Sequence, residues 1–210
     1  MRLPALLLAL TATTALPGCA ALSLLQGEPD RDVFELRGPE VTARQCGRGR
    51  IGELVVELPK TRGTLDSERI MIRPSALQTQ YLPDAVWGDP VPATLQRMLV
   101  ETLGAYDSFS HVGRAPLGVA GDYALISEIK DFNAELAGKG AIVRMTVDAQ
   151  MVREMDASVA SRGSFSVTTQ APSTRTEDLI PAFDAAGQQL VAQMTDWGLR
   201  AAGVNPSSCR

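Results

Sequence analysis

The chain has 210 residues, with 20 Lys and Arg against 24 Asp and Glu, which gives a net charge of −4. This mildly acidic balance, with both signs scattered along the chain, argues against a nucleic-acid partner. The 3 cysteines form no CxxC pair and there is 1 histidine, so the sequence predicts no metal site. The length suits one domain with a sizeable core.

Residues 1–18 have the pattern of a secretory signal peptide. Arg2 supplies a positive start, an apolar run follows from Leu3 to Ala15, and the small residue Gly18 precedes a candidate cleavage site. The apolar run is too short for a stable membrane span and has no stop-transfer flank.

The segment Leu16-Pro17-Gly18-Cys19 resembles the bacterial lipobox. In lipobox signals the cysteine thiol receives a diacylglyceryl group, the peptide is cut before the cysteine, and the new amino terminus is acylated with a fatty acid such as palmitate. The resemblance implies that the mature chain begins at Cys19 and is held to a membrane by lipid, because several acyl chains anchor a protein stably. The alternative is an ordinary signal peptide with a cysteine near its cleavage site.

Residues 19–32 are expected to form the lipidated amino terminus and a tether, since they lack strand alternation and end in Gly, Pro and charge. Fully extended, such a tether reaches about 45 Å. The residue after Cys19 is Ala20 and not Asp. In the enteric version of lipoprotein sorting this favours the periplasmic face of the outer membrane of a Gram-negative bacterium.

The first half of the domain is predicted to hold short strands and one helix. Strands are expected at residues 33–36 and 53–58, the latter ended by Pro59, and a hairpin at 69–73 and 77–81. A helix is expected with Asp89 as N-cap and Pro90 at its first position, ending near Gly104. A short strand at 108–112 follows.

The second half of the domain is predicted to be a meander followed by a helix. The strand at 123–136 shows one slip in its alternation, which indicates a β-bulge. The strand at 142–153 alternates regularly, and the strand at 159–169 alternates more weakly. A helix from Thr176 or Asp178 to Ala202 carries an apolar stripe. We therefore expect an α+β fold at residues 33–203: a mainly antiparallel sheet of hairpins and meander, with two amphipathic helices on one face and a tail at 204–210.

Lipidation of Cys19 would leave Cys46 and Cys209 as the remaining cysteines. In an oxidising compartment such a pair is expected to form a disulfide that ties the carboxyl-terminal tail to an amino-terminal loop. The alternative is two free thiols.

The sequence contains no convincing catalytic constellation. Asp107, Ser110 and His111 are close in sequence, but a triad is defined by geometry, and no G-x-S-x-G elbow is present. Two carboxylate pairs, Asp131 with Glu135 and Asp84 with Asp89, are better explained as solvated strand and loop positions. No Walker A segment occurs, so the chain is not expected to hydrolyse ATP, and no catalytic residue or cofactor is predicted.

Tyr81 and Trp87 are weak candidates for contacts with a partner protein, because they flank the turn into the first helix. For Trp87 the commoner alternative is a position at the edge of the core. Exposed strand edges are further candidates.

The order of these features resembles the ABC-type transport auxiliary lipoprotein family, which includes the paraquat-inducible lipoprotein of enteric bacteria. The resemblance covers residues 33–201 and depends on order and spacing more than on any one signature. Val33-Phe34 stands where family members often have a Tyr-Tyr pair. The features that match are the lipobox, the strands at 33–36, 53–58 and 69–81, Trp87 with the Asp89-Pro90 helix, the strand beginning at Asp122-Tyr123, and the last amphipathic helix.

The resemblance implies a non-enzymatic component of a phospholipid transporter. Its partners would be an ATPase, a permease and a periplasmic MCE-domain (mammalian cell entry) protein, which the lipoprotein would dock at the outer membrane. A homo-oligomer would be compatible with a ring-forming MCE partner. Two alternatives stay open: an adaptor of another envelope machine, such as lipopolysaccharide or outer-membrane assembly, and a lipoprotein hydrolase.

Overall fold

The computed structural model describes residues 31–42, 46, 50–114 and 121–209. The predicted signal peptide, Cys19 and almost all of the predicted tether lie outside these residues. The helices are α1 (Val91–Gly104), α2 (Thr176–Ala201) and the short 3-10 turn η1 (Pro206–Ser208). The strands are β1 (Asp32–Phe34), β2 (Ile51–Val56), β3 (Lys60–Thr61), β4 (Arg69–Ser75), β5 (Gln78–Trp87), β6 (Phe109–Arg114), β7 (Tyr123–Ala137), β8 (Gly140–Arg153) and β9 (Ser158–Ala171).

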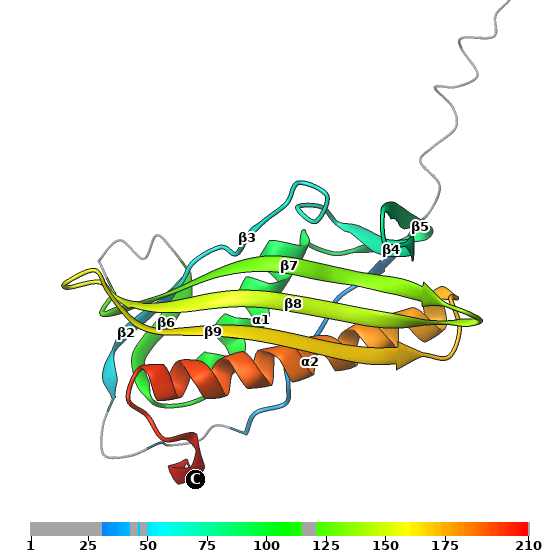
Figure 1. Cartoon of the computed structure of the whole chain (residues 1–210). Coiled ribbons are helices and arrows are strands. Elements are labelled where there is room, and N and C mark those ends of the chain that lie inside the picture. Colours follow the sequence, from blue (N-terminus) through cyan, green and yellow to red (C-terminus); the bar gives the residue numbers. More distant parts are fainter. Residues whose placement is uncertain (1–30, 43–45, 47–49, 115–120, 210) are drawn as a thin grey trace, which may run out of the picture. The chain divides into compact units, whose positions relative to one another are not determined.

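The predicted meander is confirmed as β7, β8 and β9, which pair antiparallel in sequence order. Figure 1 shows these three long strands side by side, with α2 lying along them. The predicted bulge is also confirmed, because the β7–β8 register shifts between Ile129 and Asp131. Gly138, with φ of 61°, makes the tight turn between β7 and β8, where glycine avoids the strain that a side chain would cause.

The sheet is mixed, whereas a mainly antiparallel sheet was expected. One edge of β7 pairs with β8, and its other edge pairs in parallel with β2, β3 and β4 in succession. Strand β6 pairs in parallel with β2, and β1 in parallel with β5. The predicted β4–β5 hairpin is confirmed and is antiparallel. The α+β class is confirmed, and the parallel pairings between strands distant in sequence are the correction.

Both helices and the sheet share one core. Along β8 the odd-numbered residues from Val143 to Met151 are buried, while α1 buries Leu99 and Leu103 and α2 buries Leu190 and Met194. Gly187 of α2 lies at a close approach between these layers. A Cβ there would lie 3.2 Å from Met98 Cε of α1 and 4.0 Å from Met145 Cε of β8. The two amphipathic helices therefore cover the same face of the sheet, as predicted.

Helix α1 begins one residue later than the sequence suggests. Pro90 is its N-cap, and no side chain caps it. Asp89 is not the N-cap; its backbone carbonyl accepts a hydrogen bond from Thr94 Oγ1 at 3.3 Å. The Val91 amide donates to the carbonyl of Ser67 at 3.3 Å, so the loop before β4 supplies an acceptor for the helix start.

Candidate interaction surface

Tyr81, a predicted partner contact, is half-buried on β5. Its hydroxyl donates to the carbonyl of Thr64 at 3.1 Å, and the guanidinium carbon of Arg69 lies 3.9 Å from the ring centre. The hydrogen bond holds the loop between β3 and β4 against the hairpin, and the contact with Arg69 joins the two strands of the hairpin. Tyr81 therefore has a structural role, and only part of its ring is open to a partner.

Trp87 lies in the core. It is 2% exposed, and its ring packs edge-on against Phe183 of α2 at 5.3 Å and Phe132 of β7 at 6.3 Å. Because a buried ring offers no surface to a partner, Trp87 is not part of the candidate interaction surface. The burial agrees with the alternative considered for this residue, a place at the core.

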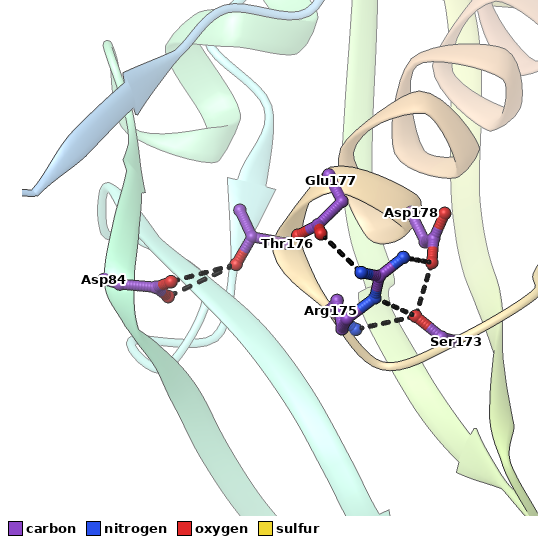
Figure 2. Close-up of polar contacts among 6 residues, drawn as sticks. All are labelled: Asp84, Ser173, Arg175, Thr176, Glu177 and Asp178. Atoms are coloured by element: carbon purple, nitrogen blue, oxygen red, sulfur yellow. Dashed lines mark hydrogen bonds and ion pairs between the residues drawn. The ribbon is translucent and has the colours of Figure 1, made fainter.

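Asp84, one of the two carboxylates of the pair Asp84 and Asp89, joins two elements of the fold. Asp84, near the end of β5, accepts a hydrogen bond from Thr176 Oγ1 at 3.2 Å to Oδ1 and 3.3 Å to Oδ2. Figure 2 shows this contact joining β5 to the first residue of α2. The Asp84 carboxylate thus links β5 to α2.

The start of α2 is fixed by a second group of polar contacts, also drawn in Figure 2. Arg175 pairs with Glu177 at 2.8 Å and with Asp178 at 3.2 Å, and Ser173 Oγ donates to the Asp178 carboxylate. The hydrogen bond from Ser173, followed by that from Arg175, lowers the pKa of Asp178 below its usual range. Negative charge in the first turn stabilises the helix, so these residues serve the fold.

Ser110 and His111 do not converge. They are consecutive residues of β6, and consecutive side chains of a strand point to opposite faces. Asp107 precedes the strand and accepts a hydrogen bond from Arg50 Nε at 2.7 Å. His111 is exposed and lies opposite Glu53 of β2 in the register. The described geometry therefore brings together no nucleophile and base at this strand.

Asp131 and Glu135, the other carboxylate pair, each face a different arginine. Asp131 lies 4.0 Å from Arg62, and Glu135 accepts two hydrogen bonds from Arg144 of β8, at 2.9 and 3.1 Å. The hydrogen bond from Arg144 is the main reason that the pKa of Glu135 is lowered from its usual value. The Glu135–Arg144 contact joins β7 to β8, and the Arg62–Asp131 contact joins the residue after β3 to β7.

The Glu135–Arg144 pair yields a prediction on pH. A folded-state pKa below that of the unfolded chain gives stability that is present above the unfolded pKa and is lost as pH falls through the folded pKa. Because both side chains are more than a third exposed, we expect Glu135→Gln to cost only about 0.5 kcal/mol at neutral pH. Urea unfolding of both proteins should show this difference vanish in acid. A difference that persists unchanged in acid would contradict the assignment.

A groove of about 550 Å³ lies on the face of the sheet away from the helices. Lys60 of β3 and Arg162 of β9 line it, and neither forms an ion pair with another described residue. Lys130 joins Glu128 at 2.6 Å and Asp148 at 3.9 Å nearby. Both signs of charge therefore line this groove, which suits a polar partner surface. Its lining residues are Lys60, Ile126, Ser127, Glu128, Asp148, Ala149, Gln150, Arg162, Gly163 and Ser164.

The predicted disulfide between Cys46 and Cys209 is confirmed. The two Cα atoms lie 4.0 Å apart across a sequence separation of 163 residues, and the two residues also form an isolated antiparallel bridge. Cys46 is buried. The bond ties the tail after α2 to the segment before β2.

Two further features bear on the class of protein. Within the described ranges, no group of at least 3 His, Cys, Asp or Glu side chains is placed to hold a metal ion. No helix among the same residues is long and apolar enough to cross a membrane. The described site is thus a polar surface on an α+β domain that contains a disulfide. Most of the charged and aromatic residues discussed above contact neighbouring helices or strands.

This architecture is that of a family of envelope lipoproteins. The model of the ABC-type transport auxiliary lipoprotein component family matches residues 34–195, and the chain belongs to that family. Membership indicates a location in the cell envelope and association with an ABC transport system. None of the curated proteins matches the sequence.

Solved structures share the fold. A Xanthomonas campestris protein assigned to the family model DUF330 superposes with a TM-score of 0.71 at 22% identity, over 81% of this chain and 96% of that chain. A second crystal structure, of an uncharacterized protein, gives a TM-score of 0.59 at 13% identity, over 80% of this chain and 98% of that chain. At such identities the likeness concerns the fold alone.

Proposed function

We propose that the chain is a lipid-anchored accessory component of an ABC/MCE-type phospholipid transport system. Its domain docks the periplasmic MCE assembly at the outer membrane, and its mature form begins at Cys19, followed by a tether at residues 19–32. The observation that carries the proposal is the family match over residues 34–195. In this proposal the chain works beside an ATPase, which supplies the energy, and a permease.

The physical character of the domain supports a non-enzymatic role. His111 and Ser110 point to opposite faces, and Asp84 and Glu135 are each engaged in contacts that join neighbouring elements. By contrast, Lys60 and Arg162 line an open groove and form no ion pair with another described residue, so the charges of a partner can reach them there. A charged surface of this kind suits binding of a partner protein better than catalysis.

Co-purification tests the proposal. The full chain, tagged at its carboxyl terminus and expressed at native level, is extracted from the envelope in mild detergent and purified beside an unrelated tagged lipoprotein. We expect an MCE-domain protein, with the permease and ATPase, to be enriched over the control in comparable molar amounts. Enrichment of a large outer-membrane barrel protein in place of the MCE protein would contradict the proposal and support an adaptor of outer-membrane assembly.

A further inference from the structure

Strand β9 forms a long edge of the sheet. It has 14 residues and pairs with β8 alone among the described strands. The other described strands with one neighbour are much shorter, since β6 has 6 residues, β1 has 3 and β3 has 2. At about 3.4 Å per residue, β9 presents an edge of roughly 48 Å.

The hydrogen-bond register of β7, β8 and β9 determines which N–H and C=O groups of β9 point away from β8. The carbonyl of Leu125 accepts from the Glu57 amide at 3.0 Å, so the backbone groups of Leu125 point away from β8 and those of its even-numbered neighbours in β7 point toward β8. The register pairs Ile126 with Gln150, so even-numbered residues of β8 bond to β7 and odd-numbered residues bond to β9. Met145 pairs with Val167, so the odd-numbered residues of β9 from Ser161 to Ala171 are bonded to β8.

From Arg162 to Gln170, the even-numbered residues of β9 therefore direct their N–H and C=O groups outward. No hydrogen bond between described backbone groups outside the regular elements involves residues 160–171. Side chains on the same residues face away from the helices and are exposed. These outward residues are Arg162, Ser164, Ser166, Thr168 and Gln170.

This edge lacks the usual protection against pairing. Natural edge strands are kept short or carry lysines, prolines or bulges. The segment from Ser161 to Ala171 has no proline and no lysine, and Arg162 is its one charged residue. The β8–β9 register shifts once, between Met151 and Val152, and it is unbroken along the rest of the strand. That shift leaves Ala160 of β9 without a partner residue, so the regular, almost uncharged part of the edge runs from Ser161 to Ala171, and this part can accept another strand.

The surroundings of β9 define what an added strand would meet. On the helix side, Phe165 stacks edge-on with Trp197 of α2 at 5.5 Å, and Val167 is buried. On the opposite side, Ser164 donates to Asp148 at 2.7 Å, and a row of hydroxyl side chains continues along the strand. A segment with alternating apolar and polar residues matches both sides.

We propose that β9 is the docking edge for an extended segment of the MCE-domain partner, which adds to the sheet as a further strand. This inference rests on the proposed function. A second copy of the chain fits less well. Helix α2 packs chiefly on β9, neighbouring strands lie about 4.8 Å apart, and packed helices need about 8–10 Å between their axes. Pairing β9 with β9 would crowd the two α2 helices, whereas a strand without a helix has room.

The test measures binding of the purified periplasmic part of the MCE protein to the mature domain. Thr168→Pro removes an outward N–H while leaving the β8 ladder complete, and edge positions of this kind tolerate proline. Thr168→Ser is the matched control, because it keeps the N–H and the hydroxyl. We expect Thr168→Pro to weaken binding at least about tenfold and Thr168→Ser to change it less than about twofold.

Hydrogen–deuterium exchange on the unmutated protein gives a second readout that does not depend on the folding of the variant. The even-numbered amides from Arg162 to Gln170 should exchange rapidly in the free domain and become protected in the complex. Tight binding without this protection, or unchanged affinity of folded Thr168→Pro, would overturn the docking edge and leave the proposed function standing. Failure of the unmutated domain to bind the MCE protein would instead overturn both. A dimer of the domain that Thr168→Pro dissociates would show self-pairing and overturn the assignment to a partner.

Discussion

Phe183→Ala is expected to lower the free energy of unfolding by about 3–5 kcal/mol. Phe183 of α2 is fully buried, and its ring stacks on Phe132 of β7 at 5.9 Å and packs edge-on against Trp87 of β5 at 5.3 Å. The three rings join a helix to two strands that are distant in sequence. Truncation would leave a cavity and remove both ring contacts, because close-packed cores relax only partly around a missing group.

Urea unfolding followed by circular dichroism measures this effect. Leu77→Ala is the matched control, since Leu77 is a large apolar residue that is fully exposed at the β4–β5 turn. We expect the control to stay within about 0.5 kcal/mol of the unmutated domain. A loss below about 1 kcal/mol for Phe183→Ala would contradict the packing described for the three rings.

Replacing both Cys46 and Cys209 by Ser is expected to cost about 2–4 kcal/mol, with about 5 kcal/mol as the upper bound of the chain-entropy model. The disulfide closes a separation of 163 residues, so its loss frees almost the whole unfolded chain. The folded state should change little, because helices α1 and α2 keep their own packing against the sheet.

Urea unfolding of oxidised protein and of the double variant measures this loss. The dependence on urea should also become steeper, because an unfolded chain without the cross-link exposes more surface. Reduction of the unmutated protein should reproduce the result of the double variant. Equal transition midpoints for all three forms would mean that the bond does not stabilise the domain.

Local patterns were sufficient to predict much of this fold. The alternation from Val143 to Met151 defined β8 and its buried face, and the slip before Phe132 marked the bulge in β7. The apolar stripes of α1 and α2 follow from spacings of three and four residues. The disulfide could be predicted because lipidation of Cys19 would leave two cysteines.

The parallel pairings of β2, β3 and β4 with β7 could not be predicted in this way. They join residues far apart in sequence, and nothing in the local pattern of Lys60 or Ile72 identifies β7 as their neighbour. For the same reason the sequence did not show that Trp87 lies between α2 and β7, or that Asp84 bonds to Thr176. The hydrophobic pattern of the sequence shows which face of a helix or strand is buried. Only the assembled fold determines which other element packs against that face.

The candidate surface was the least predictable part. Of the two aromatic candidates, Tyr81 is half-buried with its hydroxyl bonded to Thr64, and Trp87 is in the core. The groove between Lys60 and Arg162 and the open edge of β9 depend on the order of strands in the sheet. The low charge of residues 158–171 can be seen in the sequence, but it has meaning only once the strand is known to lie at an edge.

The proposed function requires the domain to act from a membrane anchor. Cys19→Ala removes the proposed lipid attachment site and changes no residue of the folded domain, so envelope fractionation should find the variant folded and soluble in the periplasm. The decisive measurement is phospholipid transport between the two membranes in cells that carry only this variant, compared with cells that carry the unmutated chain. We predict that transport is lost. Normal transport by the soluble form would contradict the account.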